Sequence, residues 1–144
     1  MILQAQGDDL FSAAALAAEL WPGHTQAELV QELSPVVCGD GGAIFLLLLD
    51  ERPCGFAQCQ LRRDYVEGTS TSPVGYLEGL YVRPEQRGRG WGRALVERCE
   101  GWARDKGCRE FASDCELGNA PSLAFHLKAG FSEANRIICF KKQL

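Results

Sequence analysis

Residues 74 to 114 contain an apolar segment, a basic glycine-rich turn, an amphipathic segment and a second apolar segment in immediate succession. The first segment, Val74 to Val82, predicts a strand that ends before Pro84. After the turn, apolar residues recur at helical spacing as far as Gly107, a residue typical of the position after a helix end. Glu110 to Ser113 predicts another strand. This order of elements predicts a parallel crossover and a mixed α/β fold.

Helix and strand signals also alternate through the rest of the chain, with no repeat, linker or low-complexity segment. At 144 residues, the chain is expected to form a single domain spanning residues 1–144. The segment Thr25-Gln-Ala-Glu28 has the residues of a capping box, which predicts the start of a helix. The other expected elements are a short strand in residues 1–6, a helix capped by Asp8 or Asp9 and ending before Trp21, the end of the Thr25 helix at Pro35, strands at Ala43–Leu49 and Cys54–Arg62, a loop at 64–73, a helix capped by Asn119 and closed by Gly130, and a final strand at Phe131–Lys142.

The composition, 46% hydrophobic and 24% charged, is that of an ordinary globular domain. The longest apolar run, Ala43 to Leu49, is far too short to cross a bilayer, and the first residues lack the pattern of a signal peptide. The seven cysteines contain no C-x-x-C spacing and there are only two histidines, so we expect no metal site. We expect the cysteines to be small buried side chains in a reducing cytoplasm.

The formal net charge is -4, yet residues 83–95, RPEQRGRGWGRAL, hold four arginines and three glycines. Because the arginines are clustered while acidic residues are scattered, no broad basic face for nucleic acid is expected, and no membrane partner either. An acidic protein is better matched to a cationic substrate. The basic turn is therefore expected to bind a small anion.

The basic turn leads directly into a helix N-terminus, where backbone N–H groups have no intrahelical partner and the helix dipole adds partial positive charge. Glycines allow the backbone to approach an anion, and arginines add forked donors. The turn therefore predicts a phosphate or pyrophosphate site, the alternative being a solvated turn that happens to be basic. The spacing of Gly88, Gly90 and Gly92 fits neither the P-loop nor the G-x-G-x-x-G dinucleotide pattern.

The spacing Arg87-x-x-Gly90-x-Gly92 resembles the acetyl-CoA-binding signature of the GCN5-related N-acetyltransferases (GNAT), and Asn119-Ala-Pro-Ser122 with FHLKAGF at 125–131 resembles that family's fourth helix. The resemblance implies a central mixed, mostly antiparallel sheet flanked by helices, with no metal. It also implies that the loop amides hold the pyrophosphate of acetyl-CoA. The cofactor-binding residues that it implies are Leu80, Tyr81, Val82, Arg87, Gly88, Arg89, Gly90, Trp91, Gly92, Arg93, Asn119 and Ser122.

A narrower resemblance is to the aminoglycoside 6'-N-acetyltransferases of this fold, which inactivate antibiotics and are typically homodimers. It rests on LWPGH at 20–24, RRDYVEGTSTSPVGYLEGLYV at 62–82 and EFASD at 110–114. It implies a direct transfer in a ternary complex. The residues implied to line the antibiotic cleft are Trp21, His24, Tyr65, Glu78 and Asp114.

Acetylation of an amine needs a neutral nitrogen, so a carboxylate that accepts the proton is expected near the thioester. Glu78 is the first candidate for this base, and a carboxylate that only binds substrate is the equal alternative. Gly79 beside it predicts a bulge in the strand, and the amides of Leu80 to Val82 are expected to hold the pantetheine arm. Glu67 and Glu116 are interpreted as surface charges.

Two positions depart from the family pattern. Where many relatives have a tyrosine that protonates the departing thiolate, this chain has His126, which leaves the general acid open. Asn135 replaces an acid that faces the antibiotic in some relatives. Two other functions remain: acetylation of a polyamine or another small amine by the same fold, and a non-catalytic acyl-CoA-binding module, against which the acidic pair Glu78 and Asp114 argues.

Overall fold

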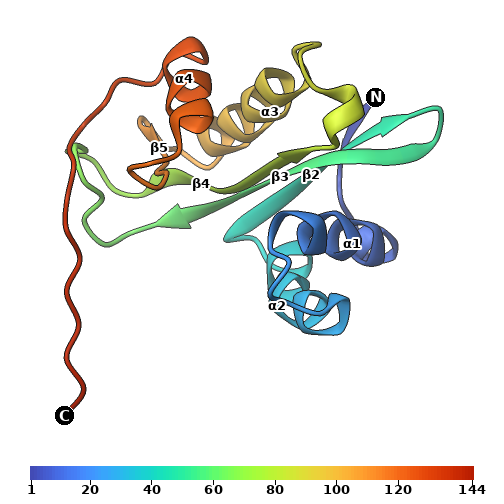
Figure 1. The fold of residues 1–144 in the computed structure, drawn as a ribbon, viewed down its shortest axis with the longest axis horizontal. Helices are drawn as coiled ribbons and strands as arrows, with labels where there is room; N and C mark the ends of the chain where they lie inside the picture. The colour runs from blue at the N-terminus through green and yellow to red at the C-terminus, as the bar shows by residue number, and fades with distance from the viewer.

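The computed structural model describes all 144 residues, with a five-stranded sheet at its centre (Figure 1). The strands lie side by side in chain order, the first four antiparallel and β5 parallel to β4. This confirms the mixed, mostly antiparallel sheet and the crossover between the last two strands. The strands are β1 (Ile2–Gln4), β2 (Gly42–Leu49), β3 (Arg52–Arg62), β4 (Val74–Val82) and β5 (Phe111–Ala112).

Helices α1 (Leu10–Leu20) and α2 (Gln26–Cys38) cover one face of the sheet, and the 3-10 turn η1 (Gly7–Asp9) precedes them (Figure 1). The capping box is confirmed: the Thr25 hydroxyl accepts the Glu28 N–H, and the Glu28 carboxylate accepts the Thr25 N–H. The expectation that Pro35 ends this helix is wrong, because α2 continues to Cys38. Pro35 is exposed, so the helix carbonyl that lacks its N–H partner faces solvent. The burial of Val36 in the next turn stabilises the continued helix.

Helices α3 (Trp91–Asp105) and α4 (Ala120–Lys128) cover the opposite face, and the 3-10 turn η2 (Pro84–Gln86) precedes α3 (Figure 1). The expected apolar face of α3 is buried through Leu95, Cys99 and Trp102. Four cysteines are buried as expected, whereas Cys38, Cys115 and Cys139 are exposed. No helix has the length and apolar character needed to cross a membrane.

The expected final strand, Phe131–Lys142, is absent, and this part of the chain leaves the body of the molecule as an extended segment (Figure 1). Its apolar side chains are unusually exposed: Ile138 is 81% and Phe140 90% accessible. The residues have strand-forming character, but a strand also requires a neighbouring edge with which to pair, and no strand of this chain pairs with the segment.

Candidate active site

Strand β4 has two different edges. One edge pairs with β3 from Val74 to Val82 except at a bulge, whereas the other edge pairs with β5 only at Gly75 and Tyr76. From Leu77 to Val82 no strand lies beside it on that side. The backbone of this open edge is therefore free to form strand-like hydrogen bonds with an extended ligand, which is the position expected for the pantetheine arm at Leu80–Val82.

The open edge leads into the basic turn. Gly88 and Gly90 have left-handed φ values of +73° and +83°, and Gly90 is the N-cap of α3. None of the backbone N–H groups of residues 88–93 has a backbone acceptor. The Arg87 Nε donates to the Val82 carbonyl at 2.7 Å and so ties the turn to the end of β4. These unpaired amides at a helix N-terminus fit a pyrophosphate.

The second part of the expected cofactor site lies on α4, next to the start of α3. Asn119 caps α4 by accepting the Ser122 N–H at 3.2 Å, as expected. A Cβ at Gly92 would lie 3.1 Å from the Phe125 ring, so the glycine permits the close approach of the two helices. Trp91 is partly buried at the start of α3, whereas Arg89 and Arg93 are exposed. All the expected cofactor residues thus lie on the β4 edge, the turn and the first turns of two adjacent helices.

A cavity of about 320 Å³ lies on the face of the sheet that α2 covers, and residues of α2, β3 and β4 line it. Three of the expected substrate residues line it: Trp21, His24 and Glu78. The Trp21 indole packs directly on Gly79, where a Cβ would lie only 2.8 Å from it. Sequence reasoning missed the other lining residues, which follow the helical repeat of α2 and the central strand β3: Leu29, Glu32, Leu33, Val36, Gln58 and Gln60.

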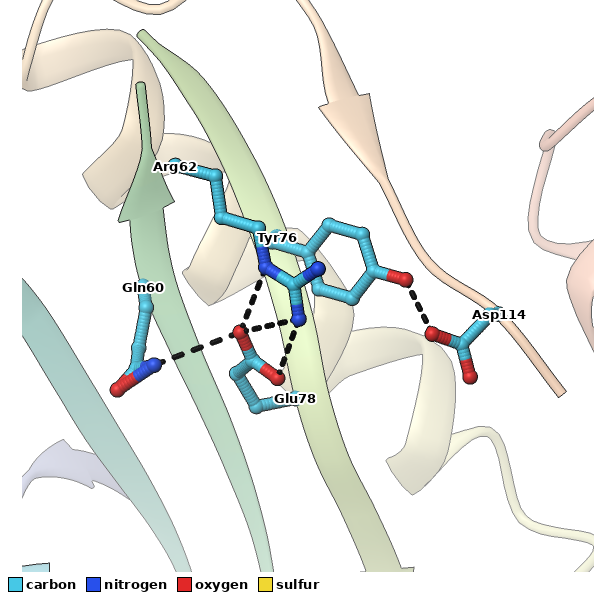
Figure 2. Close-up of polar contacts among 5 residues, drawn as sticks. All are labelled: Gln60, Arg62, Tyr76, Glu78 and Asp114. Atoms are coloured by element: carbon cyan, nitrogen blue, oxygen red, sulfur yellow. Dashed lines mark hydrogen bonds and ion pairs between the residues drawn. The ribbon is translucent and has the colours of Figure 1, made fainter. Parts of the chain in front are cut away.

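Glu78 occupies a bulge in β4. The pairing passes from Gln58–Gly79 to Cys59–Leu77, so Glu78 has no direct partner on β3. The bulge expected beside Gly79 is therefore present, and it directs the carboxylate to the cavity. Figure 2 shows that this carboxylate is surrounded by donors: Gln60 Nε2 at 3.4 Å, and Arg62 through both Nε and Nη2.

Arg62 also links Glu78 to a second polar pair. Its guanidinium carbon lies 3.4 Å from the ring centroid of Tyr76, whose hydroxyl donates to Asp114 (Figure 2). Burial, followed by this hydrogen bond, raises the pKa of Tyr76, so the phenol stays protonated. Asp114 therefore belongs to the same network as Glu78, although it does not line the cavity.

Two other expected substrate residues lie outside the cavity. The Tyr65 side chain is exposed, and its hydroxyl accepts the Gly68 N–H at 3.4 Å. Asn135, on the extended C-terminal segment, donates to Glu67 Oε1 at 2.7 Å. Neither residue lines the cavity.

His126 has partners at both ring nitrogens. Nδ1 lies 2.7 Å from the Ser122 carbonyl, and Nε2 lies 2.8 Å from the Ser113 hydroxyl. A carbonyl can only accept, so Nδ1 carries a proton and Nε2 of the neutral ring accepts from Ser113. In this arrangement a neutral His126 has no free proton to donate.

Residues 9–131 match the acetyltransferase (GNAT) family. Over 144 residues, the chain is 42% identical to an aminoglycoside N(6')-acetyltransferase type 1 from Stenotrophomonas maltophilia, covering 99% of this chain and 93% of the relative. It is 34% identical to a protein of the same name from Serratia marcescens, covering 100% and 99%. Its fold is similar to a structure of AAC(6')-Iy in complex with the bisubstrate analogue CoA-S-monomethyl-acetylneamine, with a TM-score of 0.96, 35% identity and coverage of 100% and 98%.

Proposed function

Because this chain belongs to the acetyltransferase (GNAT) family, we propose that it transfers the acetyl group of acetyl-CoA to the 6'-amine of aminoglycosides. The observation that carries the proposal is the position of Glu78. Its carboxylate faces the cavity at a bulge in β4, the strand whose opposite edge leads to the anion-binding turn. Relatives that match the whole chain bear the name of this activity.

The proposed reaction is a direct transfer with both substrates bound. The neutral amine nitrogen attacks the thioester carbonyl carbon, the carbon–sulfur bond breaks, the nitrogen gives up a proton, and the thiolate of CoA takes one up. For an amine with a pKa of roughly 10.4, removing its proton at pH 7 costs about 4.6 kcal/mol. Oxygen substituents of an aminoglycoside lower this cost. Holding both reactants in one geometry supplies much of the remaining rate enhancement.

Glu78 is the proposed acceptor of the proton from the substrate ammonium, directly or through a water. It is the only carboxylate of β4, and its side chain is 20% exposed, so a bound amine would reach it in a partly desolvated site. Proton donation to the thiolate is proposed for His126. This role requires the ring to be protonated, so that Nε2–H donates to the thiolate directly or through the Ser113 hydroxyl.

The acceptor side combines an aromatic wall with several carboxylates. Trp21 offers a flat surface for a sugar ring, and Glu78 and Glu32 line the same cavity. His24 Nδ1 lies 3.8 Å from carboxylate oxygens of both Glu28 and Glu32. Such a set suits a polycation. We propose that Asp114, Tyr65 and Asn135 complete the binding site around this cavity.

We also propose a homodimer. Ile138 and Phe140 on the C-terminal segment are almost fully exposed. Neighbouring large apolar side chains on a protein surface are typical of an interaction site. A second copy can pair with this segment and receive the same contact in return. Light scattering is expected to give twice the chain mass. Ile138→Asp with Phe140→Asp is expected to give a monomer, whereas Lys142→Asp, in the same segment, leaves the dimer intact.

The test of the activity is acetyl transfer to kanamycin A and tobramycin, with an aminoglycoside bearing a 6'-hydroxyl as control. We expect a single product acetylated at the 6'-nitrogen, assigned by mass spectrometry and NMR, and little turnover of the control. Acetylation at another nitrogen contradicts the 6' assignment. Turnover of a polyamine alone identifies the other amine acetyltransferase, and binding of acetyl-CoA without any turnover identifies a binding module.

The physiological consequence that we propose is antibiotic resistance, exerted in the cytoplasm, where the chain's seven cysteines stay reduced. Expression in a susceptible bacterium is expected to raise the inhibitory concentration of tobramycin but not that of a 6'-hydroxyl aminoglycoside. Equal protection against both drugs, or none, would contradict this role.

A further inference from the structure

The carboxylate that the proposed reaction needs is already bound to a cation of the chain itself. Arg62 donates from Nε and Nη2 to Glu78 Oε1 at 3.1 and 2.9 Å, and from Nη2 to Oε2 at 3.0 Å (Figure 2). Oε1 also accepts from Gln60. Three donor contacts on Oε1 leave it little capacity for a further N–H, because a carboxylate oxygen offers about two lone-pair sites.

Arg62 is bound in a way that permits release. It is the last residue of β3, it precedes a loop, and its side chain is 43% exposed. Glu78 is its only carboxylate partner. Its other contact is the face of Tyr76, which is held in place by burial and by the hydrogen bond to Asp114. The pair is bidentate but partly exposed, so its net free energy is modest, and a cation that gains additional contacts can displace the arginine.

We propose that Arg62 occupies, in the free enzyme, the position on Glu78 that the reacting amine of the substrate takes, and that substrate binding displaces it. This inference rests on the proposed aminoglycoside activity. The displaced guanidinium can remain stacked on Tyr76 while it releases the carboxylate. Glu78 then meets the substrate ammonium and becomes available as the proton acceptor.

Displacement makes the Arg62 pair a free-energy cost that every amine substrate must meet. A monoamine has a single ammonium group, and with it must displace a guanidinium that makes two-point contact with Glu78. A polycation also contacts the other carboxylates of the cavity, such as Glu32, and these contacts offset the loss of the Arg62 pair. Arg62 therefore weakens the binding of every amine, and only substrates with several ammonium groups regain the lost affinity from the other carboxylates.

The experiment compares Arg62→Gln with Arg63→Gln, which removes the same charge from the adjacent, exposed residue. Steady-state kinetics are measured with tobramycin and with a monocationic 6-amino-6-deoxyglucoside. For Arg62→Gln we expect the KM of both substrates to fall by a similar factor, about tenfold, because both displace the same guanidinium; for Arg63→Gln we expect KM changes below about twofold. Arg62→Lys, a one-point donor, is expected to be intermediate.

Three results would overturn the displacement. The first is equal KM changes in Arg62→Gln and Arg63→Gln, which would indicate charge alone. The second is a tenfold fall in kcat with KM unchanged, which would make Arg62 a fixed positioning residue for Glu78. The third is a crystal structure of the parent enzyme with tobramycin in which Arg62 still contacts Glu78 at both oxygens; we expect that contact to be broken. Absence of turnover with every aminoglycoside would instead refute the proposed function, and calorimetric binding of tobramycin to the same variants would still test the displacement.

Discussion

Replacing Gly90 by valine tests the link between backbone conformation and cofactor binding. Gly90 has φ +83° and ψ 1°, and no atom lies within 4 Å of the place where a Cβ would be. The cost is therefore backbone strain, about 1–2 kcal/mol for an L-residue in this left-handed region and more for a β-branched one. If the turn relaxes to remove the strain, the unpaired N–H groups of residues 88–93 change their directions. We expect acetyl-CoA affinity to fall at least tenfold, which corresponds to about 1.4 kcal/mol.

The matched control is Gly101→Val. Gly101 lies inside α3, also has open space at its Cβ position, and does not have a positive φ. Because glycine and valine differ by only about 0.5 kcal/mol in helix propensity, this variant is expected to keep its stability and its acetyl-CoA affinity. Calorimetry measures the affinities and denaturant unfolding measures the stabilities. Unchanged affinity in a folded Gly90→Val protein would remove the turn from the cofactor site.

Three further predictions concern β4. Glu78→Gln is expected to lower kcat about 10²-fold or more with acetyl-CoA affinity intact, as stopped-assay kinetics and calorimetry will measure; a rise in substrate KM alone would make Glu78 a binding group. Gly79→Val places side-chain atoms where the Trp21 indole lies, 2.8 Å from the new Cβ, so we expect a higher aminoglycoside KM and lower tryptophan burial by fluorescence quenching. Because burial and the Asp114 carboxylate both disfavour the phenolate, Tyr76 is expected to stay protonated at pH 10, and its stabilising contribution is lost only as the pH rises further. Ultraviolet titration of the parent and Tyr76→Phe should therefore give equal tyrosinate absorbance at pH 10, and a deficit in the variant would refute this.

Local signals predicted most of the fold. The strand Val74–Val82 has the bounds expected from its apolar run and Pro84, and the Thr25 and Asn119 caps form the expected hydrogen bonds. The prediction that Pro35 ends the helix is wrong because the effect of a proline depends on which side of the helix meets solvent. The prediction of a final strand is wrong because strand propensity does not specify a pairing edge.

The candidate site shows the same division. The bulge at Glu78 could be inferred because Gly79 marks it in the sequence. The role of Arg62 could not be inferred, because it depends on a contact with Glu78 between two neighbouring strands. One exposed arginine in a polar run carries no signal of that contact. Glu32 was missed for a related reason. Its position at the cavity wall follows from how α2 packs on the sheet.

The two sides of β4 differ in their origin along the chain. The cavity is lined largely by α2, β3 and the segment before α2, whereas the basic turn and both of its helices follow β4. We therefore expect mutations between Trp21 and Val36 to change the proposed substrate range without changing acetyl-CoA affinity. Under the proposed function, substitutions in this N-terminal third are expected to alter the drug spectrum, and exchanging it between relatives is expected to do the same.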